Sequence, residues 1–447
     1  MAVQVGAVGA RELGRLSLRM GSLNAAGLAH TCVSVRDMWT KPVATLAMSL
    51  GLGWIGSALA PSVSFALPCS SLPNPVYVAG SIAAGPLVKP VAQSLTRDDA
   101  VKLTLVWQLK NSCSAVESLA RDTMPASCAV GACITGKAQF WTIDPRDLQP
   151  GECDLEVKGT KLDLAISDVA PAMCPGLSGT MTTGLLDTLG PISAYGIVMS
   201  AKAGESAIQA EEAHFVFGAG KSAGVLPWQN DSVITLLGDN NAGQLLTGQQ
   251  IKLPPGRWKG VSAATADDVM STVSGDPASG IGILPTTLTD PVRAQVKVLA
   301  FQAIKQHGAF YPDRKATTFE KQNVRDGHYP LWGYMHLLQR PDPVNPAKPL
   351  SPNGARVAGI LQGATPVAGK DPVVLQVQAG FIPQCAMKVA RTSDSAPLAP
   401  VAITESCNCW FEKNVQSGTL GCTPCADGKT CASGKCRRYL CEGEEKK

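Results

Sequence analysis

Small polar residues follow four apolar runs of this 447-residue chain, and they have the clearest potential for chemistry. They are Gly80-Ser81, residues 111–114 (Asn-Ser-Cys-Ser), Ser167-Asp168 and residues 240–243 (Asn-Asn-Ala-Gly). The first two precede helix-like segments, where free backbone N–H groups and a hydroxyl offer an anion its hydrogen bonds. Each run taken alone also fits an ordinary N-cap or turn. The four runs therefore predict a ligand site only if the fold brings them together.

The segments around these runs alternate between strand-like and helix-like patterns, which is typical of βαβ units with a parallel sheet. We expect strands at 76–79, 101–107, 162–166, 192–199, 233–237 and 281–284. Helices are expected at 86–95, 115–121, 207–217, with Ser206 as N-cap, and 263–273. The Pro-rich region 340–400 predicts strands at 356–361 and 373–377. Open α/β sheets bind ligands at the carboxyl ends of their strands, where the polar runs would meet.

Length and charge limit the classes of protein to consider. A chain of 447 residues corresponds to two or three domains. With 39 basic and 35 acidic residues the net charge is +4, so no strongly basic face is expected and nucleic acid is not predicted as a partner. Fifteen cysteines indicate an oxidising compartment.

An apolar segment near the start of the sequence has the pattern of a signal peptide. No charged residue occurs between Lys41 and Lys89, residues 43–60 are apolar, and residues 64–66 (Ser-Phe-Ala) suit a cleavage point. We expect residues 1–37 to be an extension upstream of the true start, residues 38–66 to be the signal peptide, and the mature chain to begin near Leu67. Retention as a membrane anchor and lipidation at Cys69 are the alternatives.

Cysteines are concentrated near the C-terminus. Seven of them fall between residues 407 and 441: Cys407, Cys409, Cys422, Cys425, Cys431, Cys436 and Cys441. Their spacing lacks the two widely separated C-x-x-C pairs of a zinc ribbon, so a disulfide knot is favoured over a metal site. Because seven is odd, one partner must lie outside the tail, and Cys385 is the nearest. Residues 122–160, with Cys128, Cys133 and Cys153, are interpreted as a second disulfide-tied excursion.

Taken in order, the motifs form a longer pattern. Residues 77–81 (Tyr-Val-Ala-Gly-Ser) precede a helix, 104–107 lead to 111–114, and 164–168 read Leu-Ala-Ile-Ser-Asp, followed by a strand at 191–199, Pro227-Trp228 and Gly-Ile-Gly at 280–282. Over about residues 74–335 this succession resembles the phosphate-type periplasmic substrate-binding proteins. The resemblance implies an α/β, two-lobed periplasmic-binding-protein-like fold with hinge crossovers. Residues 67–190 would form the first lobe, with 285–400 returning to it, 191–284 the second lobe, and 401–447 a disulfide-rich C-terminal module that the family lacks.

The resemblance also implies a set of ligand contacts. In the first lobe these are Ser81, Ile82, Ser112, Ser114, Ser167 and Asp168. In the second lobe, Asn241 and Gly243 occupy the stretch where the family has an Arg followed by Ser-Gly-Thr, and neither feature is present. The guanidinium of such an Arg supplies charge-assisted bidentate hydrogen bonds to an oxyanion. Its absence here, together with the presence of the acidic Asp239, weakens the prediction that the ligand is phosphate.

Two further patterns combine residue types that could carry chemistry. Residues 311–314 and 322–332 combine aromatic, basic and acidic side chains that suit either a binding surface or internal packing, and packing is favoured. His328 has no His or Cys at metal-ligand spacing, so no metal site is predicted. Residues 220–224 (Gly-Lys-Ser-Ala-Gly) have the letters of a nucleophile elbow, but they follow a helix-like segment rather than a strand. No catalytic residue and no cofactor are predicted.

The sequence as a whole predicts an exported protein of the periplasm or cell surface that captures a small polar or anionic solute, phosphate-like ones being favoured, without transforming it. Its expected partners are that solute and an ABC-type membrane transporter, with protein contacts through the Cys-rich tail. The alternative is a secreted surface or adhesion protein that kept this scaffold and lost its ligand site. An enzyme is the third hypothesis.

Overall fold

The computed structural model describes residues 67–98, 102–121, 134–141, 149–177, 179–238, 241–401, 405–418, 421–426, 431–433 and 435–443. The predicted upstream extension and signal peptide lie outside the described residues, as do Cys128, Cys133, Asp239 and Asn240. In the part of the chain that is described, no helix has the length and apolar character needed to cross a bilayer.

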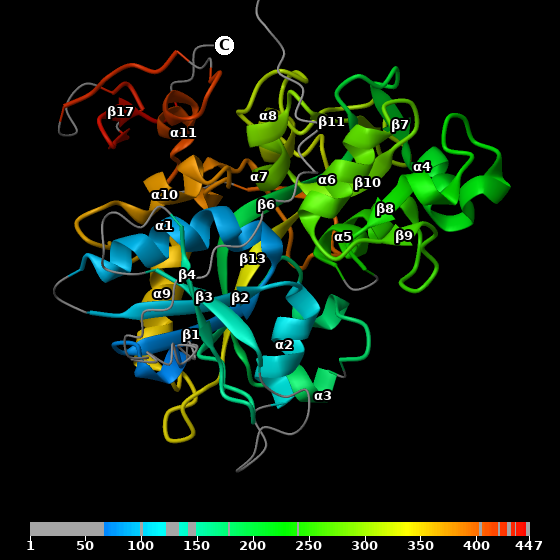
Figure 1. Ribbon diagram of the computed structural model, residues 1–447. Helices are drawn as coiled ribbons and strands as arrows, with labels where there is room; N and C mark the ends of the chain where they lie inside the picture. The colour runs from blue at the N-terminus through cyan, green and yellow to red at the C-terminus, as the bar shows by residue number, and fades with distance from the viewer. Residues whose placement is uncertain are drawn as a thin grey trace, which may run out of the picture. The chain divides into compact units, whose positions relative to one another are not determined.

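A mixed sheet of eleven strands organises the described residues (Figure 1). Its order is β4-β3-β2-β1-β5-β13-β6-β10-β8-β9, with β11 also paired to β6. The strands are β1 Pro75–Gly80, β2 Thr104–Leu109, β3 Lys137–Phe140, β4 Gly151–Asp154, β5 Leu164–Ser167, β6 Leu186–Ser200, β8 Ile234–Leu236, β9 Val261–Ser262, β10 Ile281–Pro285, β11 Val296–Val298 and β13 Trp332–Gln339. Shorter pairs are β7 Ala207–Gln209 with β12 Ala300–Gln302, β14 Val389–Ala390 with β15 Ala399–Pro400, and β16 Cys436–Arg437 with β17 Leu440–Cys441.

Two strands, β6 and β13, connect the halves of this sheet. The first half contains β1 to β5, and the second half contains β8 to β11. The first part of β6, residues 186–194, pairs antiparallel with β13, while residues 195–199 pair with β10. On the other side of β13, strand β5 leads into the parallel strands β1 and β2. The predicted α/β class, with two lobes built on crossing strands, is confirmed by this topology, whereas the predicted lobe boundaries stay predictions.

Helices cover both faces of each half. The helices are α1 Gly85–Thr96, α2 Ser112–Arg121, α3 Gly179–Thr182, α4 Ala210–Ala219, α5 Ala242–Ile251, α6 Ala266–Gly275, α7 Thr286–Thr289, α8 Gln322–Arg325, α9 Pro352–Gln362, α10 Pro372–Gln378 and α11 Asn408–Asn414. Alternate residues of β1, β2 and β5 pack against α1, α9 and α10 on one face and against α2 on the other (Figure 1). In the second half, α4 and α5 pack on one face of β6 and β10, and α6 packs on the opposite face.

Some of the predicted elements are wrong in kind. Residues 356–361 and 373–377 belong to helices α9 and α10, not to strands. Both helices begin with a proline, and the side chains of Ser351 and Asp371 accept hydrogen bonds from the first-turn N–H groups of Gly354 and Val373. Short apolar runs in a Pro-rich region do not distinguish a buried helix from a strand. Here the N-cap hydrogen bonds stabilise the helical conformation.

The helix predicted at 207–217 also begins later than expected. Residues 207–209 form strand β7, and α4 starts at Ala210. Gln209, not Ser206, is the N-cap, in a reciprocal capping box with Glu212.

Disulfides fix both ends of the described chain. Cys69 is bonded to Cys153 and Cys113 to Cys174 in the first half. The C-terminal region contains the pairs Cys409–Cys422, Cys425–Cys436 and Cys431–Cys441, and it is joined to the main body by Cys385–Cys407. The predicted disulfide knot and the predicted partner Cys385 are confirmed.

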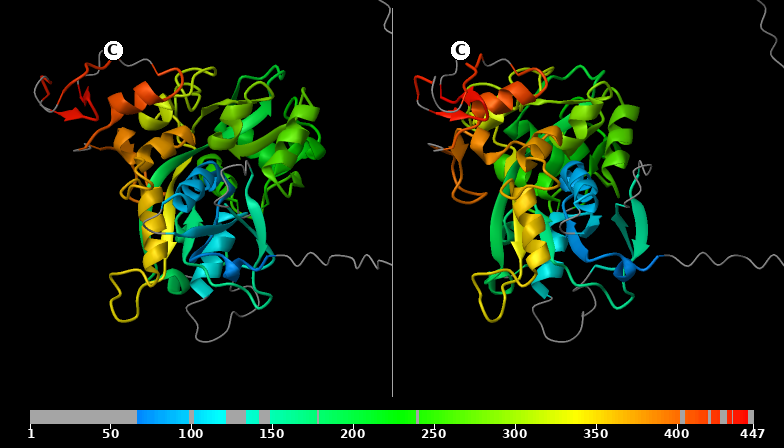
Figure 2. Two further views of the ribbon diagram at one scale, coloured as in Figure 1. Left: turned by 60° about the vertical axis from the view of Figure 1, so that its left-hand side comes forward. Right: turned by 90° about the vertical axis from the view of Figure 1, so that its left-hand side faces the viewer.

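The C-terminal helix α11 also packs onto the main body through a buried ion pair, next to α10 (Figures 1 and 2). Arg325 of α8 donates to the carboxylate of Glu412 and, at 2.8 Å, to the Asn408 side chain. Its guanidinium lies 4.8 Å from the centre of the Phe411 ring.

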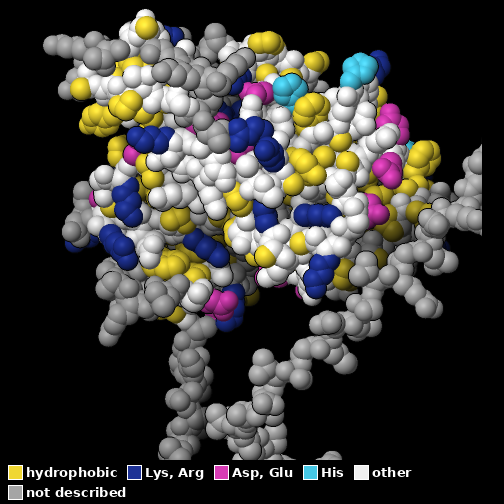
Figure 3. Space-filling model, turned by 90° about the horizontal axis from the view of Figure 1, so that it is seen from above, with side chains coloured by type: hydrophobic (Ala, Val, Ile, Leu, Met, Phe, Trp, Pro, Cys, Tyr) yellow, Lys and Arg dark blue, Asp and Glu magenta, His cyan; other side chains and the backbone are white. Residues whose placement is uncertain are grey.

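On the face of the molecule in Figure 3, Lys and Arg side chains are spread among hydrophobic ones rather than gathered in one patch.

Removing one member of this ion pair is expected to destabilise the fold strongly. The side chains of Arg325 and Glu412 are only 1% and 4% exposed, so Glu412→Ala leaves a buried charge without its partner and should lower the free energy of unfolding by about 3 kcal/mol or more. The matched control is Glu117→Ala, whose pair with Arg121 is 40% and 47% exposed and should contribute below about 0.5 kcal/mol. Urea denaturation compares the two variants, and equal losses would contradict this role for the buried pair.

Candidate functional site

The predicted residues Ser81 and Asp168 meet at the carboxyl ends of β1 and β5. These strands are parallel neighbours, so the residues that follow them emerge at the same edge of the sheet. Gly80 permits the close approach, because a Cβ at that position would lie 2.3 Å from the carbonyl oxygen of Ile166. The Ser81 hydroxyl donates to Oδ2 of Asp168, and the backbone N–H of Asp168 donates to the Ser112 hydroxyl at 3.1 Å. Three of the predicted residues thus form one cluster.

Tyr195 of β6 completes the cluster from the strand that joins the two halves. Its hydroxyl donates to Asp168 Oδ2 at 2.6 Å. Gly243, near the start of α5, packs against this ring so closely that a Cβ there would lie 2.8 Å from a Tyr195 ring carbon. Tyr195 is not among the site residues predicted from the sequence, although a tyrosine within an apolar strand signals a buried hydroxyl in need of a partner.

The carboxyl of Asp168 is wholly buried. Burial raises its pKa, and the hydrogen bonds from Ser81 and Tyr195 offset this only in part. Burial and the neighbouring Asp168 carboxylate also raise the pKa of Tyr195, so its hydroxyl remains a donor. Oδ1 of Asp168 has no hydrogen-bond partner within the described residues. The cluster is therefore a desolvated acceptor with one oxygen unsatisfied.

The other predicted site residues do not join these contacts. Ile82 is half-buried at the start of the turn after Ser81. Ser114 is exposed, bonds the Asn111 carbonyl at 3.2 Å and lines a pocket of about 200 Å³. The buried Ser167 hydroxyl donates to the carbonyl of Val169 at 2.6 Å. Asn241 caps α5 by accepting from the Gly243 N–H at 2.9 Å. Their binding roles stay predictions, whereas capping and turn contacts account for Asn241 and Ser167 as observed.

A second group of ionisable residues lies one strand away, around His336 of β13, in which His336 and Asp394 are buried and the side chain of Asp187 is 33% exposed. Its Nδ1 lies 2.7 Å from Asp187 Oδ2, and its Nε2 lies 3.3 Å from Asp394 Oδ2. Burial alone would lower the pKa of His336, but the two carboxylates outweigh it and raise this pKa to about 9. Asp394 Oδ2 also accepts from the Ala170 N–H at 2.5 Å. The imidazolium thus connects β13, β6 and the loop around residue 394.

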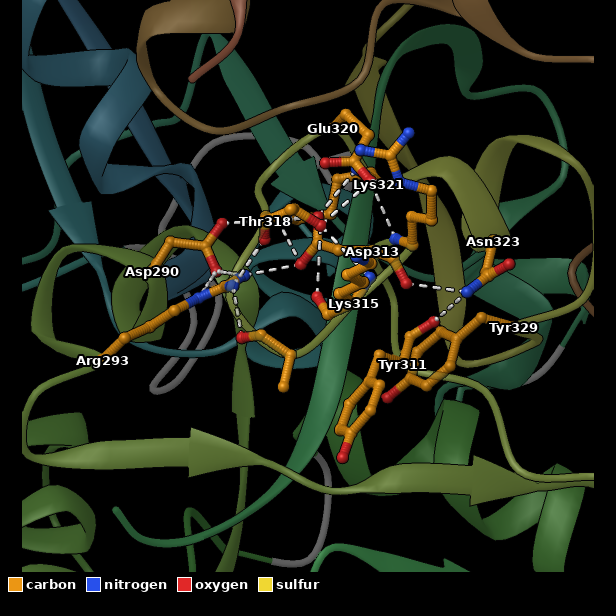
Figure 4. A network of polar contacts seen from close by, with 12 residues as sticks. Asp290, Arg293, Tyr311, Asp313, Lys315, Thr318, Glu320, Lys321, Asn323 and Tyr329 are labelled. Carbon is orange, nitrogen blue, oxygen red and sulfur yellow. Dashed lines mark hydrogen bonds and ion pairs between the residues drawn. The ribbon is translucent and has the colours of Figure 1, made fainter. Parts of the chain in front are cut away.

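The charged residues between 311 and 332 form a structural network, as the packing interpretation predicted (Figure 4). Arg293 lies 2.6 Å from both Asp290 and Asp313, and the buried Lys321 contacts the same two carboxylates at 2.6 and 3.0 Å. The Asn323 side chain donates to the carbonyls of Tyr311 and Asp313 at 3.0 and 2.7 Å. Two cations balance two carboxylates in this network, so these four charged side chains pair with one another.

No family model matches this sequence, and no curated protein sequence is similar to it. Among solved structures, a putative phosphate ABC transporter substrate-binding protein from Clostridium perfringens with bound phosphate shares 10% identity at a TM-score of 0.43, covering 69% of this chain and 99% of the other. An ABC-type phosphate transport receptor from Vibrio cholerae shares 11% at 0.43, over 69% and 99%. The reduced OxyR regulatory domain from Pseudomonas aeruginosa shares 12% at 0.32, over 61% and 92%. Likenesses of this extent do not identify a ligand.

The raised pKa of Asp168 predicts how the stability of an Asp168→Asn variant compares with wild type across pH. Because the folded-state pKa lies above the unfolded one, the contribution of Asp168 is full below the ordinary pKa of 3.8 and is lost as pH rises through the folded pKa. Each unit of that shift corresponds to about 1.4 kcal/mol. Wild type should therefore lose stability relative to Asp168→Asn as pH rises from the acid range to neutrality, which urea denaturation at several pH values measures. A constant difference would contradict the desolvation of Asp168.

His336 predicts a change at the alkaline end. Its folded-state pKa of about 9 lies above the ordinary 6.5, so its contribution is fully present below pH 6.5 and is lost as pH rises through about 9. This contribution is of the order of 3 kcal/mol. The difference in melting temperature between wild type and His336→Gln should shrink over that window. A difference that persists above it would show that His336 acts through packing and not through its charge.

Proposed function

We propose that this protein is an exported, non-enzymatic solute-binding protein that holds a small polar or anionic solute at Asp168, between the lobes. The observation that carries the proposal is Oδ1 of Asp168, which is buried and lacks a hydrogen-bond partner among the described residues. Buried polar atoms are almost always satisfied, so each exception needs an explanation, and ionisable groups with perturbed pKa values cluster at functional sites. A ligand that donates a hydrogen bond supplies the missing partner.

The carboxylate also selects among anions. It repels a fully deprotonated oxyanion but accepts a hydrogen bond from one that keeps a proton. Phosphate retains an O–H group near neutral pH, whereas sulfate does not. A phosphate-like solute is therefore favoured over sulfate, even though the sequence lacks the Arg that would bind an oxyanion in bidentate fashion.

Export and partners follow from the same proposal. The six disulfides among the described cysteines suit an oxidising compartment, either the periplasm or the cell surface. A captured solute needs a membrane component to receive it, and we propose an ABC-type transporter for this role. The disulfide-rich C-terminal region is proposed to contact other proteins.

A second candidate is a surface or adhesion protein that has lost its ligand site. The observation in its favour is that the protein's own groups occupy the place predicted for a ligand. The Tyr195 hydroxyl takes up Asp168 Oδ2, and Ala242 and Leu246 of α5 share an apolar cluster with Ala79 and other residues of the first half. In this reading the Asp168 cluster joins the two halves and binds nothing.

A thermal-shift titration separates the two candidates. Solute at a hundredfold excess over its Kd should stabilise wild type by about 2.7 kcal/mol, with phosphate effective and sulfate not. Asp168→Ala should abolish the shift, while Asp267→Ala, at an exposed carboxylate of α6, should keep it. The panel includes molybdate, sugars and amino acids. If no solute gives an Asp168-dependent shift in a folded protein, the solute-binding proposal is wrong.

Tyr195→Phe sharpens the comparison. It removes one hydroxyl, at a cost in stability of about 1 kcal/mol, and leaves Ser81 as the remaining donor to Asp168 Oδ2, so that a ligand can take the place of the Tyr195 hydroxyl. Solute binding should then be equal to or tighter than in wild type. Under the surface-protein alternative, the variant is only less stable and acquires no solute response.

A further inference from the structure

A second cavity lies beside α5, on residues that the Asp168 cluster does not use. Its volume is about 530 Å³, which is in the range of small-molecule sites. Helix α5 and the segment after it contribute Gln244, Gln249, Leu253 and Trp258. Met173, which follows β5, and Ser395, in the loop after β14, also line it. Chain segments from several parts of the fold thus converge on one cavity.

One residue of this lining, Gln244, has a buried side-chain amide whose hydrogen bonds are not accounted for by the described protein. It is 2% exposed, and neither Oε1 nor Nε2 has a hydrogen-bond partner within the described part of the chain. A buried amide normally has its donors and its acceptor satisfied, so an amide with both ends unpaired marks a position where a ligand completes the bonding. Such a ligand must both accept and donate hydrogen bonds.

The rest of the lining defines the chemistry of that ligand. Gln249 and Gln250 add further amides. Among the described residues of the lining there is no carboxylate, and the single cation, Lys252, is exposed. A cationic ligand would find no counter-charge here, and a dianion would find only one solvated ammonium group. Trp258, which is held against Phe217 with ring centres 5.6 Å apart, supplies apolar surface together with Leu253. Side-chain amides can hydrogen-bond to hydroxyl groups, and an indole can pack against the C–H groups on one face of a ring. Together these groups suit a sugar ring.

We propose that this cavity binds a neutral saccharide, with the Gln244 amide bonded to its hydroxyls and Trp258 packed against the ring. The proposal does not rest on solute binding at Asp168, because the two sites share no side chain. The saccharide is either a free sugar or the end of a larger glycan, since both present the same ring.

Isothermal titration of the full chain with D-glucose, D-galactose, D-mannose and N-acetylglucosamine tests the proposal. At least one should bind. Gln244→Met, which keeps the side-chain size and removes the amide, should weaken that binding about tenfold or more. Its melting temperature should stay equal or rise, because an unpaired buried amide is removed. Gln295→Met makes the same change at an exposed position and should bind as wild type does.

Further titrations distinguish a free sugar from the end of a glycan, and they separate the Gln244 cavity from the Asp168 site. Methyl glycosides of the same sugars imitate the end of a glycan, so preference for them over the free sugars indicates a glycan ligand. Gln244→Met should leave the Asp168-dependent phosphate response unchanged, so either proposal can fail without the other. Binding by none of the sugars and glycosides, or binding that Gln244→Met leaves undiminished, would overturn the saccharide proposal.

Discussion

The pairing of β6 with β13 is the constraint on which the rest of the structure depends. Every residue of β13, and every residue of β6 from Gly190 onward, is buried. Because side chains alternate between the faces of a strand, a slip of one residue would turn each of these strands inside out. The register therefore fixes both halves of the sheet. It also places Tyr195 against Asp168 and His336 between two carboxylates.

The buried carboxyl of Asp168 lowers the stability of the fold at neutral pH, and this cost is the main physical reason to assign it a function. A carboxyl group with its pKa raised by burial is held in an environment that disfavours its charge. The hydroxyls of Ser81 and Tyr195 reduce that cost, and Oδ1 remains unsatisfied within the described residues. By contrast, the network of Asp290, Arg293, Asp313 and Lys321 is larger, but its charges are balanced by its own members.

The sequence predicted the part of the site that local order determines. Parallel strands bring their carboxyl ends together, so Ser81, Ser112 and Asp168 could be placed from the strand pattern alone. Tyr195 could not be placed in this way, because its contact depends on how β6 crosses from one half to the other. Asn241 and Ser114 look like ligand contacts in sequence, and they cap or begin helices in the structure. The sequences of α9 and α10 predict strands although they form helices, because apolar runs of that length fit both kinds of element. The odd number of cysteines in the tail predicts Cys385 as a partner from outside it, and the structure identifies Cys407 as the cysteine with which Cys385 pairs.

The proposed function requires the desolvated carboxyl of Asp168 to accept a hydrogen bond from a solute. Carbon-detected NMR of the Asp168 carboxyl, assigned by its loss in Asp168→Asn, tests this most directly. We expect a pKa above the ordinary 3.8 in the free protein and a change in the carboxyl chemical shift when phosphate is added, with no change on adding sulfate. An ordinary pKa, together with a carboxyl signal that no solute perturbs, would contradict it.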